Sequence, residues 1–242
     1  MLTILKKHVK SLGRAFGIEF RRYRPDRSEM AQSMAMLSAH RINLIFDVGA
    51  NIGQFGKSLR EGGYRGRIIS FEPLSSARNL LLAVSDKDAD WEVATCAAIG
   101  DEDGEIDIHI AGNSASSSVL DMLDTHSNAA PESRYIGAER VPLRRLDTLA
   151  LDYLRPDSIP FLKIDTQGYE DRVLRGAGEL LGRIHGLQLE ISLVPLYDDQ
   201  VLMDELMGKV KAMGFNLWAI RPVFFDRSTG RLLQIDATFF RS

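Results

Sequence analysis

A glycine-containing turn after the first apolar run restricts the fold of this chain more than any other feature. Residues 42–46 are mostly apolar, and Asp47, Gly49 and Gly53 follow them with the spacing D-x-G-x-x-x-G. A short apolar run that ends in glycines is typical of a buried parallel strand that turns tightly into a helix. Ligands bind beside such turns, because the carboxyl ends of parallel strands open into a crevice. The sequence therefore predicts a cofactor site immediately after this strand.

Strand-like and helix-like segments alternate along most of the remaining chain. Apolar runs predict strands, and helical periodicity predicts helices. The expected strands are 67–71, 91–96, 160–164 and 187–191, and the expected helices are 52–60, 77–84, 170–181 and 201–213. Two longer strand-like runs, 215–225 and 232–240, are separated by a turn and predict an antiparallel hairpin. The order of the segments indicates an α/β fold with a mainly parallel sheet that ends in an antiparallel pair.

The middle of the chain is less regular. Alternating residues predict strands at 105–110 and 141–143, and a helix is expected at 146–154. The segment 111–137 is rich in Ser, Asn and Ala, and we expect a mobile loop there. Such a long loop in a compact domain usually has a function, so Asn113 and the serines within 114–118 are candidates to close over a cofactor or contact a hydroxyl-rich acceptor. The alternative is that the serines only make the loop flexible.

The first 40 residues are expected to form a helical extension ahead of a single domain at 41–242. Residues 1–27 carry eight Lys or Arg and two acids, a charge of +6; the whole chain has −3, which leaves −9 for the remainder. The apolar residues of this segment repeat at helical spacing: Leu2, Leu5, Val9, Leu12 and Phe16. A basic amphipathic helix of this kind packs on the main core, lies on an anionic membrane or binds a phosphorylated acceptor, and these alternatives stay open.

Composition restricts the location and the partners of the protein. No apolar run approaches the ~20 residues that a membrane-spanning helix needs, and the first residues lack the apolar stretch of a signal peptide. Cys96 is the single cysteine and cannot form an internal disulfide, which agrees with a reducing compartment. We therefore expect a cytoplasmic protein. The acidic charge of the chain beyond residue 27 argues against nucleic acid as a partner.

The turn after the first strand differs from the fingerprint of dinucleotide-binding proteins. Asn51 and Gln54 stand where that fingerprint, G-x-G-x-x-G, has its second and third glycines. Asp47 would repel a pyrophosphate but attract a ligand that carries an ammonium or sulfonium charge, and Gly49 and Gly53 let the backbone approach it closely. We expect these five residues to hold a nucleotide-like cofactor with a positive charge. The alternative for Asp47 is a purely structural turn residue.

The end of the second predicted strand carries a candidate partner for an adenosine. Glu72 lies nineteen residues after Gly53 (72 minus 53). An acid at this place accepts hydrogen bonds from both ribose hydroxyls in nucleotide-binding sheets. Pro73 and Ala98, which follow the second and third strands, are expected to flank the adenine as apolar walls.

Two acids stand at the carboxyl ends of neighbouring predicted strands. Asp165 follows the run 160–164, and Glu190 lies near the end of the next strand. Either could act as general base toward an acceptor hydroxyl, hold a divalent metal or orient the acceptor. His126, in the predicted loop, is a third candidate base. The other histidines lack the spacing of metal ligands, so no histidine-built metal site is predicted, whereas a magnesium ion held by carboxylates is compatible with the sequence.

In this order, the motifs resemble those of the FkbM family of S-adenosylmethionine-dependent methyltransferases. The resemblance rests on residues 46–54, 71–73, 162–170 and 189–190, and extends roughly over 41–221. It implies a class I methyltransferase (Rossmann-like) sheet of about seven strands with an antiparallel last strand. It also implies S-adenosylmethionine (SAM) as cofactor, held by the glycine turn and Glu72, with Asp165 and Glu190 bordering the reaction centre. The acceptor would be a hydroxyl of a sugar, a glycolipid or polysaccharide, or a secondary metabolite.

Two other classes of protein share parts of this pattern. An NAD(P)-dependent reductase or epimerase would use Glu72 in the same way, but the glycine pattern departs from its fingerprint. The Tyr-x-x-x-Lys pair of short-chain reductases is also absent. A non-catalytic binding module on a methyltransferase fold would be expected to lose the acidic and glycine positions, which are present here. We therefore expect an O-methyltransferase with a small-molecule or glycan acceptor.

Overall fold

The computed structural model describes residues 16–17 and 28–241 of the 242-residue chain. The expectation of a basic amphipathic helix in residues 1–27 therefore lies almost entirely outside the described residues. The helices are α2 (Glu29–Ala39), α3 (Gln54–Glu61), α4 (Ser75–Ser85), α5 (Asp124–Ala129), α6 (Leu146–Ala150), α7 (Glu170–Gly176) and α8 (Met203–Ala212). The strands are β1 (Leu44–Val48), β2 (Arg67–Phe71), β3 (Trp91–Val93), β4 (Ala98–Gly100), β5 (Gly104–Ala111), β6 (Tyr135–Arg145), β7 (Pro160–Ile164), β8 (Gly186–Ser192), β9 (Phe215–Phe225) and β10 (Leu232–Arg241).

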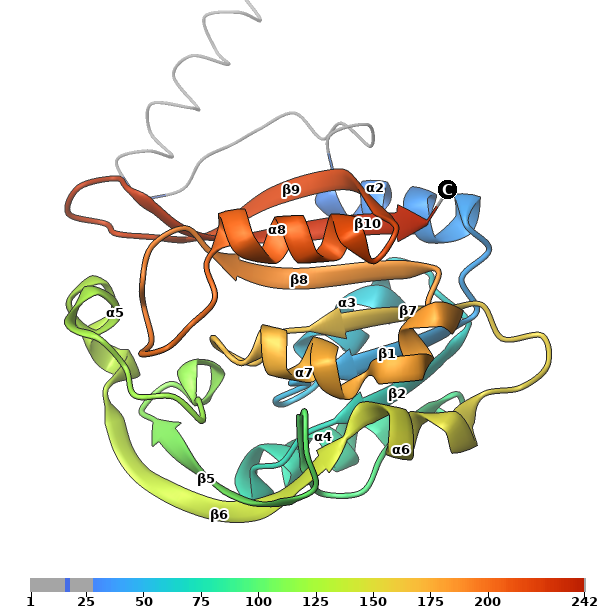
Figure 1. The fold of residues 1–242 in the computed structure, drawn as a ribbon, viewed down its shortest axis with the longest axis horizontal. Coiled ribbons are helices and arrows are strands. Elements are labelled where there is room, and N and C mark those ends of the chain that lie inside the picture. The colour runs from blue at the N-terminus through green and yellow to red at the C-terminus, as the bar shows by residue number, and fades with distance from the viewer. Residues whose placement is uncertain (1–15, 18–27, 242) are drawn as a thin grey trace, which may run out of the picture.

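A seven-stranded sheet forms the centre of the molecule (Figure 1). Its strand order is β3-β2-β1-β7-β8-β10-β9. The first five strands are parallel, and β10 runs antiparallel to both β8 and β9. This arrangement confirms the predicted α/β sheet and its antiparallel C-terminal hairpin.

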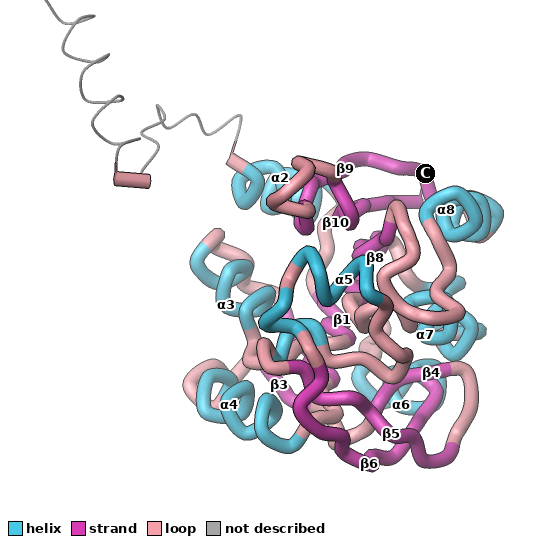
Figure 2. Tube along the Cα trace, turned by 90° about the vertical axis from the view of Figure 1, so that its left-hand side faces the viewer, coloured by secondary structure: helices cyan, strands magenta, loops and turns pink. Residues whose placement is uncertain are grey.

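Helices cover both faces of this sheet (Figures 1 and 2). Successive strand residues point to opposite faces, so Phe46 and Leu162 pack in the core beneath α6, α7 and α8. Ile45 and Phe161 pack in a second core with residues of α2, α3 and α4. Because both faces are covered, all five residues of β1 and of β7 are buried, which explains why these strands are nearly continuous apolar runs.

The predicted loop at residues 111–137 overlaps strands only at its two ends, and its mobility stays a prediction. Here β5 ends at Ala111, and β6 is an eleven-residue strand that pairs with it antiparallel. β4 adds to β6 in parallel and completes a three-stranded sheet. Between β5 and β6, two short 3-10 turns and α5 lie near the carboxyl ends of β7 and β8 (Figure 1). Gly137 and Pro142 are poor strand formers, and the long-range pairing with β5 overrides their local preference.

Several predicted helices are shorter than their periodicity indicated. The expected helix at 170–181 ends as α7 at Gly176 and continues as a 3-10 turn at Gly178–Arg183. Gly178 has a positive φ of 39°, which interrupts the α-helical path. The expected helix at 146–154 is likewise α6 followed by a 3-10 turn. None of the described helices is long and apolar enough to cross a membrane.

Candidate active site

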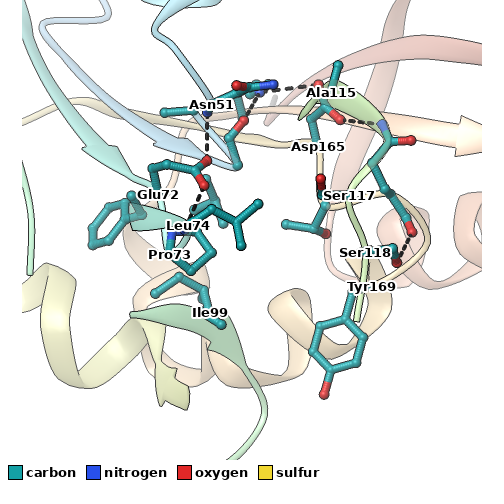
Figure 3. A pocket seen from close by; sticks show the side chains of 18 of the residues that line it. Asn51, Glu72, Pro73, Leu74, Ile99, Ala115, Ser117, Ser118, Asp165 and Tyr169 are labelled. Atoms are coloured by element: carbon teal, nitrogen blue, oxygen red, sulfur yellow. Dashed lines mark hydrogen bonds and ion pairs between the residues drawn. The ribbon is translucent and has the colours of Figure 1, made fainter. Parts of the chain in front are cut away.

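A cavity of about 370 Å³ opens at the carboxyl ends of β1, β2 and β7. Its walls come from the β1–α3 turn, the end of β2, the β7–α7 turn and residues within 114–119. Figure 3 shows Glu72, Leu74 and Ile99 on one side of it, and Ser117, Ser118 and Asp165 on the other. The cavity therefore lies where the glycine turn predicted a cofactor site.

The β1–α3 turn brings its backbone close to the cavity. Gly49, Asn51 and Gln54 line the cavity. Gly49 has a φ of 74°, and a Cβ there would collide with the backbone carbonyl of Asp165, so only glycine fits. Asn51 has a φ of 47°, a conformation that asparagine tolerates better than most residues.

Glu72 links the β1–α3 turn to the segment that follows β2. Its Oε2 accepts a hydrogen bond of 2.8 Å from the Asn51 N–H, and its Oε1 accepts one of 2.9 Å from the Leu74 N–H (Figure 3). Burial raises the pKa of Glu72 to about 7, although both N–H groups act in the opposite direction. Each carboxylate oxygen keeps a lone pair that can accept a further hydrogen bond from a ligand hydroxyl.

An apolar wall adjoins Glu72. Pro73, Leu74, Ala98 and Ile99 line the cavity next to the carboxylate. Leu74 and Ala98 also belong to a small buried cluster with residues of β5 and β6. The wall therefore has the polarity expected beside a flat aromatic ring such as adenine.

Two residues expected at the cofactor do not reach the cavity. Asp47 is 0% exposed and lies on the sheet face beneath α3, where its Oδ1 pairs with Lys163 Nζ at 3.1 Å. A direct contact between Asp47 and a cofactor is thus corrected to a structural ion pair. Gly53 faces the other way as well, since a Cβ there would meet Leu81 and Trp91.

Lys163 was missed as a site residue by sequence reasoning. It is 6% exposed, and its Nζ contacts Asp47 at 3.1 Å, Asp165 Oδ2 at 3.4 Å and the Gly49 carbonyl oxygen at 3.1 Å. Burial alone would lower the pKa of Lys163, but Asp47 and Asp165 together raise it above its ordinary value. The lysine therefore stays charged and connects the β1–α3 turn to Asp165. A charged residue inside the five-residue apolar strand β7 was the available signal.

Asp165 and Glu190 both accept hydrogen bonds from the side-chain amide of Gln167. Gln167 Nε2 donates to Asp165 Oδ1 at 2.9 Å and to Glu190 Oε2 at 2.6 Å, and its Oε1 accepts a hydrogen bond from the Tyr197 hydroxyl. Asp165 lines the cavity, whereas Glu190 does not. Burial, followed by the charge of Asp165, raises the pKa of Glu190 well above its ordinary range. Of the two carboxylates, Asp165 is the one placed to contact a substrate.

His126, the third candidate base, does not line the cavity. It lies in α5, 2% exposed, with its ring 5.1 Å from the rings of both Tyr197 and Phe224. Burial lowers the pKa of His126 to about 4. The expectation of His126 as a base is therefore corrected: its ring packs against Tyr197 and Phe224.

The serine-rich segment forms part of the cavity wall. Ser114, Ser117 and Ser118 line it. Ser114 Oγ donates to Asn51 Oδ1 at 3.1 Å, and Ser118 Oγ donates to the Gln167 carbonyl oxygen at 2.7 Å. The segment thus connects the cofactor turn with the β7–α7 turn.

Within residues 16–17 and 28–241, no group of three or more His, Cys, Asp or Glu side chains has an arrangement that could hold a metal ion.

Glu170, also near the β7–α7 turn, accepts hydrogen bonds from the Thr166 and Gly168 N–H groups. It therefore stabilises this turn from the first turn of α7.

Comparison with known families identifies the group to which this arrangement belongs. Residues 47–217 match the model of the methyltransferase FkbM domain. The chain belongs to the FkbM methyltransferase domain family. The matched range includes the β1–α3 turn, Glu72, Asp165 and Glu190, so the predicted family and fold class are confirmed for this FkbM protein.

Other known proteins are more distantly similar to this FkbM protein. The AMB antimetabolite synthetase AmbE of Pseudomonas aeruginosa is 27% identical over 176 residues. That match covers 61% of this chain and 8% of AmbE, so the chain spans a small part of its relative's length. A Burkholderia thailandensis 1,6-didemethyltoxoflavin-N1-methyltransferase is 12% identical with a TM-score of 0.47, over 90% of this chain and 80% of that one. An rRNA methylase from Streptococcus thermophilus is 13% identical with a TM-score of 0.46, over 92% of this chain and 99% of that one.

Proposed function

We propose that this protein transfers a methyl group from SAM to a hydroxyl of a small-molecule or glycan acceptor. The observation that carries the proposal is the division of the cavity between two acids. Glu72 and an apolar wall lie on one side, and Asp165 lies on the other. The first side suits an adenosine, and the second suits a reacting hydroxyl beside a positive charge.

The residues present fit SAM. Glu72 retains acceptor capacity for the ribose hydroxyls, and Leu74 and Ile99 supply apolar surface for the adenine. Gly49, Asn51 and Gln54 offer a close backbone and polar side chains. Among the residues that line the cavity, the one cation, Lys163, is already paired with carboxylates, so a positively charged ligand meets no free positive charge.

Asp165 is the proposed general base. When bound, SAM would supply a methyl group on a cationic sulfur. The sulfur would keep the electron pair of the sulfur–carbon bond as the acceptor oxygen bonds to the methyl carbon. Asp165 accepts the proton that the acceptor hydroxyl loses. Lys163 and Gln167 hold the two oxygens of the Asp165 carboxylate, which fixes its orientation. General-base help of this kind typically contributes ~100- to 10,000-fold in rate.

Calorimetry with three ligands tests the cofactor. SAM and its demethylated product S-adenosylhomocysteine (SAH) should bind the full chain, and NAD should give no heat. Binding of NAD without SAH would select the reductase alternative. With SAM labelled on its methyl group, a mass-shift screen of neutral glycosides, glycolipids and polyketides should then find a labelled ether.

The Asp165→Asn variant tests the proposed base. It keeps the size of the side chain but cannot take a proton, so we expect the turnover number to fall by about 100-fold or more while the SAH Kd changes little. Glu190→Gln is the comparison, because Glu190 contacts Gln167 but not the cavity, and a smaller loss is expected there. Full turnover in Asp165→Asn would remove this aspartate from the chemistry.

A further inference from the structure

The lining of the cavity also includes residues on the far side of β7 from Glu72. This part of the cavity is bordered by Phe55 and Ser58 of α3 and by Gln188 of β8 and Asp236 of β10. β8 and β10 lie on the far side of β7 from the β1–α3 turn. We call this part of the cavity the β8–β10 arm. The part of the cavity beside Glu72, which is proposed to hold the adenosine, does not include the β8–β10 arm.

Gln188 brings an unsatisfied amide into the β8–β10 arm. The residue is 9% exposed, and its side chain makes no hydrogen bond to any other residue in the described part of the chain. The amide is not sealed inside the protein but is open to the cavity. The neighbouring amides on this face differ, because Gln167 and Gln234 both donate to Glu190. An amide of this kind at a cavity wall is suited to a ligand that both donates and accepts.

Asp236 stands beside Gln188 on the same face. Gln188 is opposite Thr238 in the antiparallel β8–β10 pair, and Asp236 is two residues before Thr238, so the two side chains are diagonal neighbours. Asp236 makes no hydrogen bond or ion pair with another residue of the ranges 16–17 and 28–241. Its carboxylate can therefore accept hydrogen bonds from hydroxyl groups of a ligand.

The charge of the β8–β10 arm selects among acceptors. Asp165 and Asp236 line the cavity there. The cation among the lining residues is Lys163, which is held by Asp47 and Asp165. Arg221, opposite Asp236 on β9, does not line the cavity and donates to Ser33 Oγ and to the Glu29 carbonyl oxygen. A phosphate or carboxylate on the acceptor would therefore meet acids at the cavity wall, whereas hydroxyl donors would not be repelled.

We propose that Gln188 and Asp236 form an acceptor subsite that binds the hydroxyl groups of a neutral compound next to the reacting oxygen and discriminates against anionic acceptors. The inference rests on the proposed methyl transfer and adds the residues that choose the acceptor.

Calorimetry on the SAH-saturated protein tests the subsite without turnover. The probes are the methyl glycosides of glucose, mannose and rhamnose, with glucuronate as the anionic counterpart of glucose. We expect at least one neutral glycoside to bind and glucuronate to bind at least about tenfold more weakly. Gln188→Met and Asp236→Ala should each weaken that glycoside by about tenfold or more, the loss of one buried hydrogen bond. Asp236→Asn, which keeps an acceptor oxygen, should lose less.

SAH titrations of the same variants separate this proposal from the proposed function. SAH affinity should stay within about threefold of the wild type in all of them, as in the control Asp107→Asn, whose exposed carboxylate lies on β5 outside the cavity. If Gln188→Met or Asp236→Ala instead weakens SAH and spares the glycoside, the arm holds the cofactor and the subsite is refuted. Equal binding of glucuronate, or no binding of any neutral glycoside to the SAH complex, also refutes it. Failure of the wild type to bind SAH would contradict the proposed function itself.

Discussion

Lys163 is the residue on which the charge balance of the site depends. Its Nζ lies between Asp47 on β1 and Asp165 after β7, and it also donates to the Gly49 carbonyl oxygen. Because Asp47 is fully buried, water could not solvate its carboxylate if Lys163 were removed. Removal of one partner from such a buried pair leaves an uncompensated charge.

The Lys163→Met variant should be strongly destabilised. We expect the free energy of unfolding to fall by about 3–5 kcal/mol, measured by urea denaturation. Adding Asp47→Asn should recover part of the loss, because the orphaned charge is then removed. Lys209→Met is the matched control: Lys209 also contacts two acids, Asp171 and Glu205, but it is partly exposed, so about 0–1 kcal/mol is expected. Equal losses at both lysines would contradict the role assigned to burial.

Glu72 should matter for cofactor binding more than any other carboxylate of the cavity. In Glu72→Ala, the Asn51 and Leu74 N–H groups lose their acceptor and the ribose loses its partner, so SAH should bind about tenfold or more weakly in calorimetry. Glu139→Ala removes an acid that also accepts a backbone N–H, from Ser75, but outside the cavity. Its SAH affinity should be that of the wild type; a matching loss would mean that general destabilisation is being measured.

At the residue scale, the sequence predicted those site residues that belong to local motifs. Glu72, Asn51 and Asp165 line the cavity. Glu72 and Asp165 directly follow a strand and Asn51 lies in the turn after β1, and such strand ends are visible in a single sequence. Lys163, Gln188 and Asp236 were missed as site residues, because they act through neighbours on other strands. Asp47 was predicted in the right turn with the wrong partner, since the pattern does not say that a buried lysine lies beside it.

At the element scale, the β1–α3 turn depends on Gly49 for two separate reasons. Its φ is positive, and a Cβ would collide with the Asp165 carbonyl. Gly63 has a positive φ of 96° as well, but a Cβ there would meet nothing within 4 Å. A comparison of substitutions at Gly49 and Gly63 therefore distinguishes the cost of backbone strain from the cost of a steric collision.

Gly49→Ala and Gly63→Ala should differ accordingly. Gly63→Ala should lower the free energy of unfolding by about 1–2 kcal/mol through backbone strain alone and leave SAH binding intact. Gly49→Ala should cost clearly more, because the turn must move away from β7, and should abolish SAH binding. Urea denaturation and calorimetry measure both. Similar losses in the two variants, with SAH binding retained, would show that the turn has room to move.

The range of contacts explains which elements could be predicted. β1, β2 and β7 carry their own signal, because burial on both faces makes them apolar throughout. β6 carries little signal, since seven residues from Ile136 to Pro142 include one glycine, one proline and several exposed side chains. Its strand form comes from pairing with β5 and β4, which no local window contains.

At the scale of the whole molecule, buried carboxyls should make stability depend on pH. Burial raises the pKa of Glu72 and Glu170 to about 7 and that of Asp236 to about 6. The folded state then keeps protons that the unfolded chain has lost, so this stabilisation is full at low pH and is lost as pH rises through 7. His126 acts oppositely: its pKa is lowered to about 4, so its contribution is present above its ordinary pKa and lost as pH falls through 4.

Urea denaturation at several pH values tests this balance. The free energy of unfolding should fall between pH 6.5 and 8, with a shallower fall in Glu170→Gln. SAH affinity should change in the other direction and rise with pH, because ribose hydroxyls donate to the ionised form of Glu72. A flat stability profile in the wild type would mean that these carboxyls are not buried in solution.

The contacts of Lys163 also indicate how this enzyme could be redesigned. One ammonium group contacts both the turn proposed to bind the methyl donor and the acid proposed to activate the acceptor, so loss of Lys163 would disturb both. Gln188 on β8 and Asp236 on β10 make no hydrogen bond or ion pair with Lys163. A mutant library meant to accept new compounds should vary Gln188 and Asp236 and keep Lys163, Asp47 and Asp165 fixed.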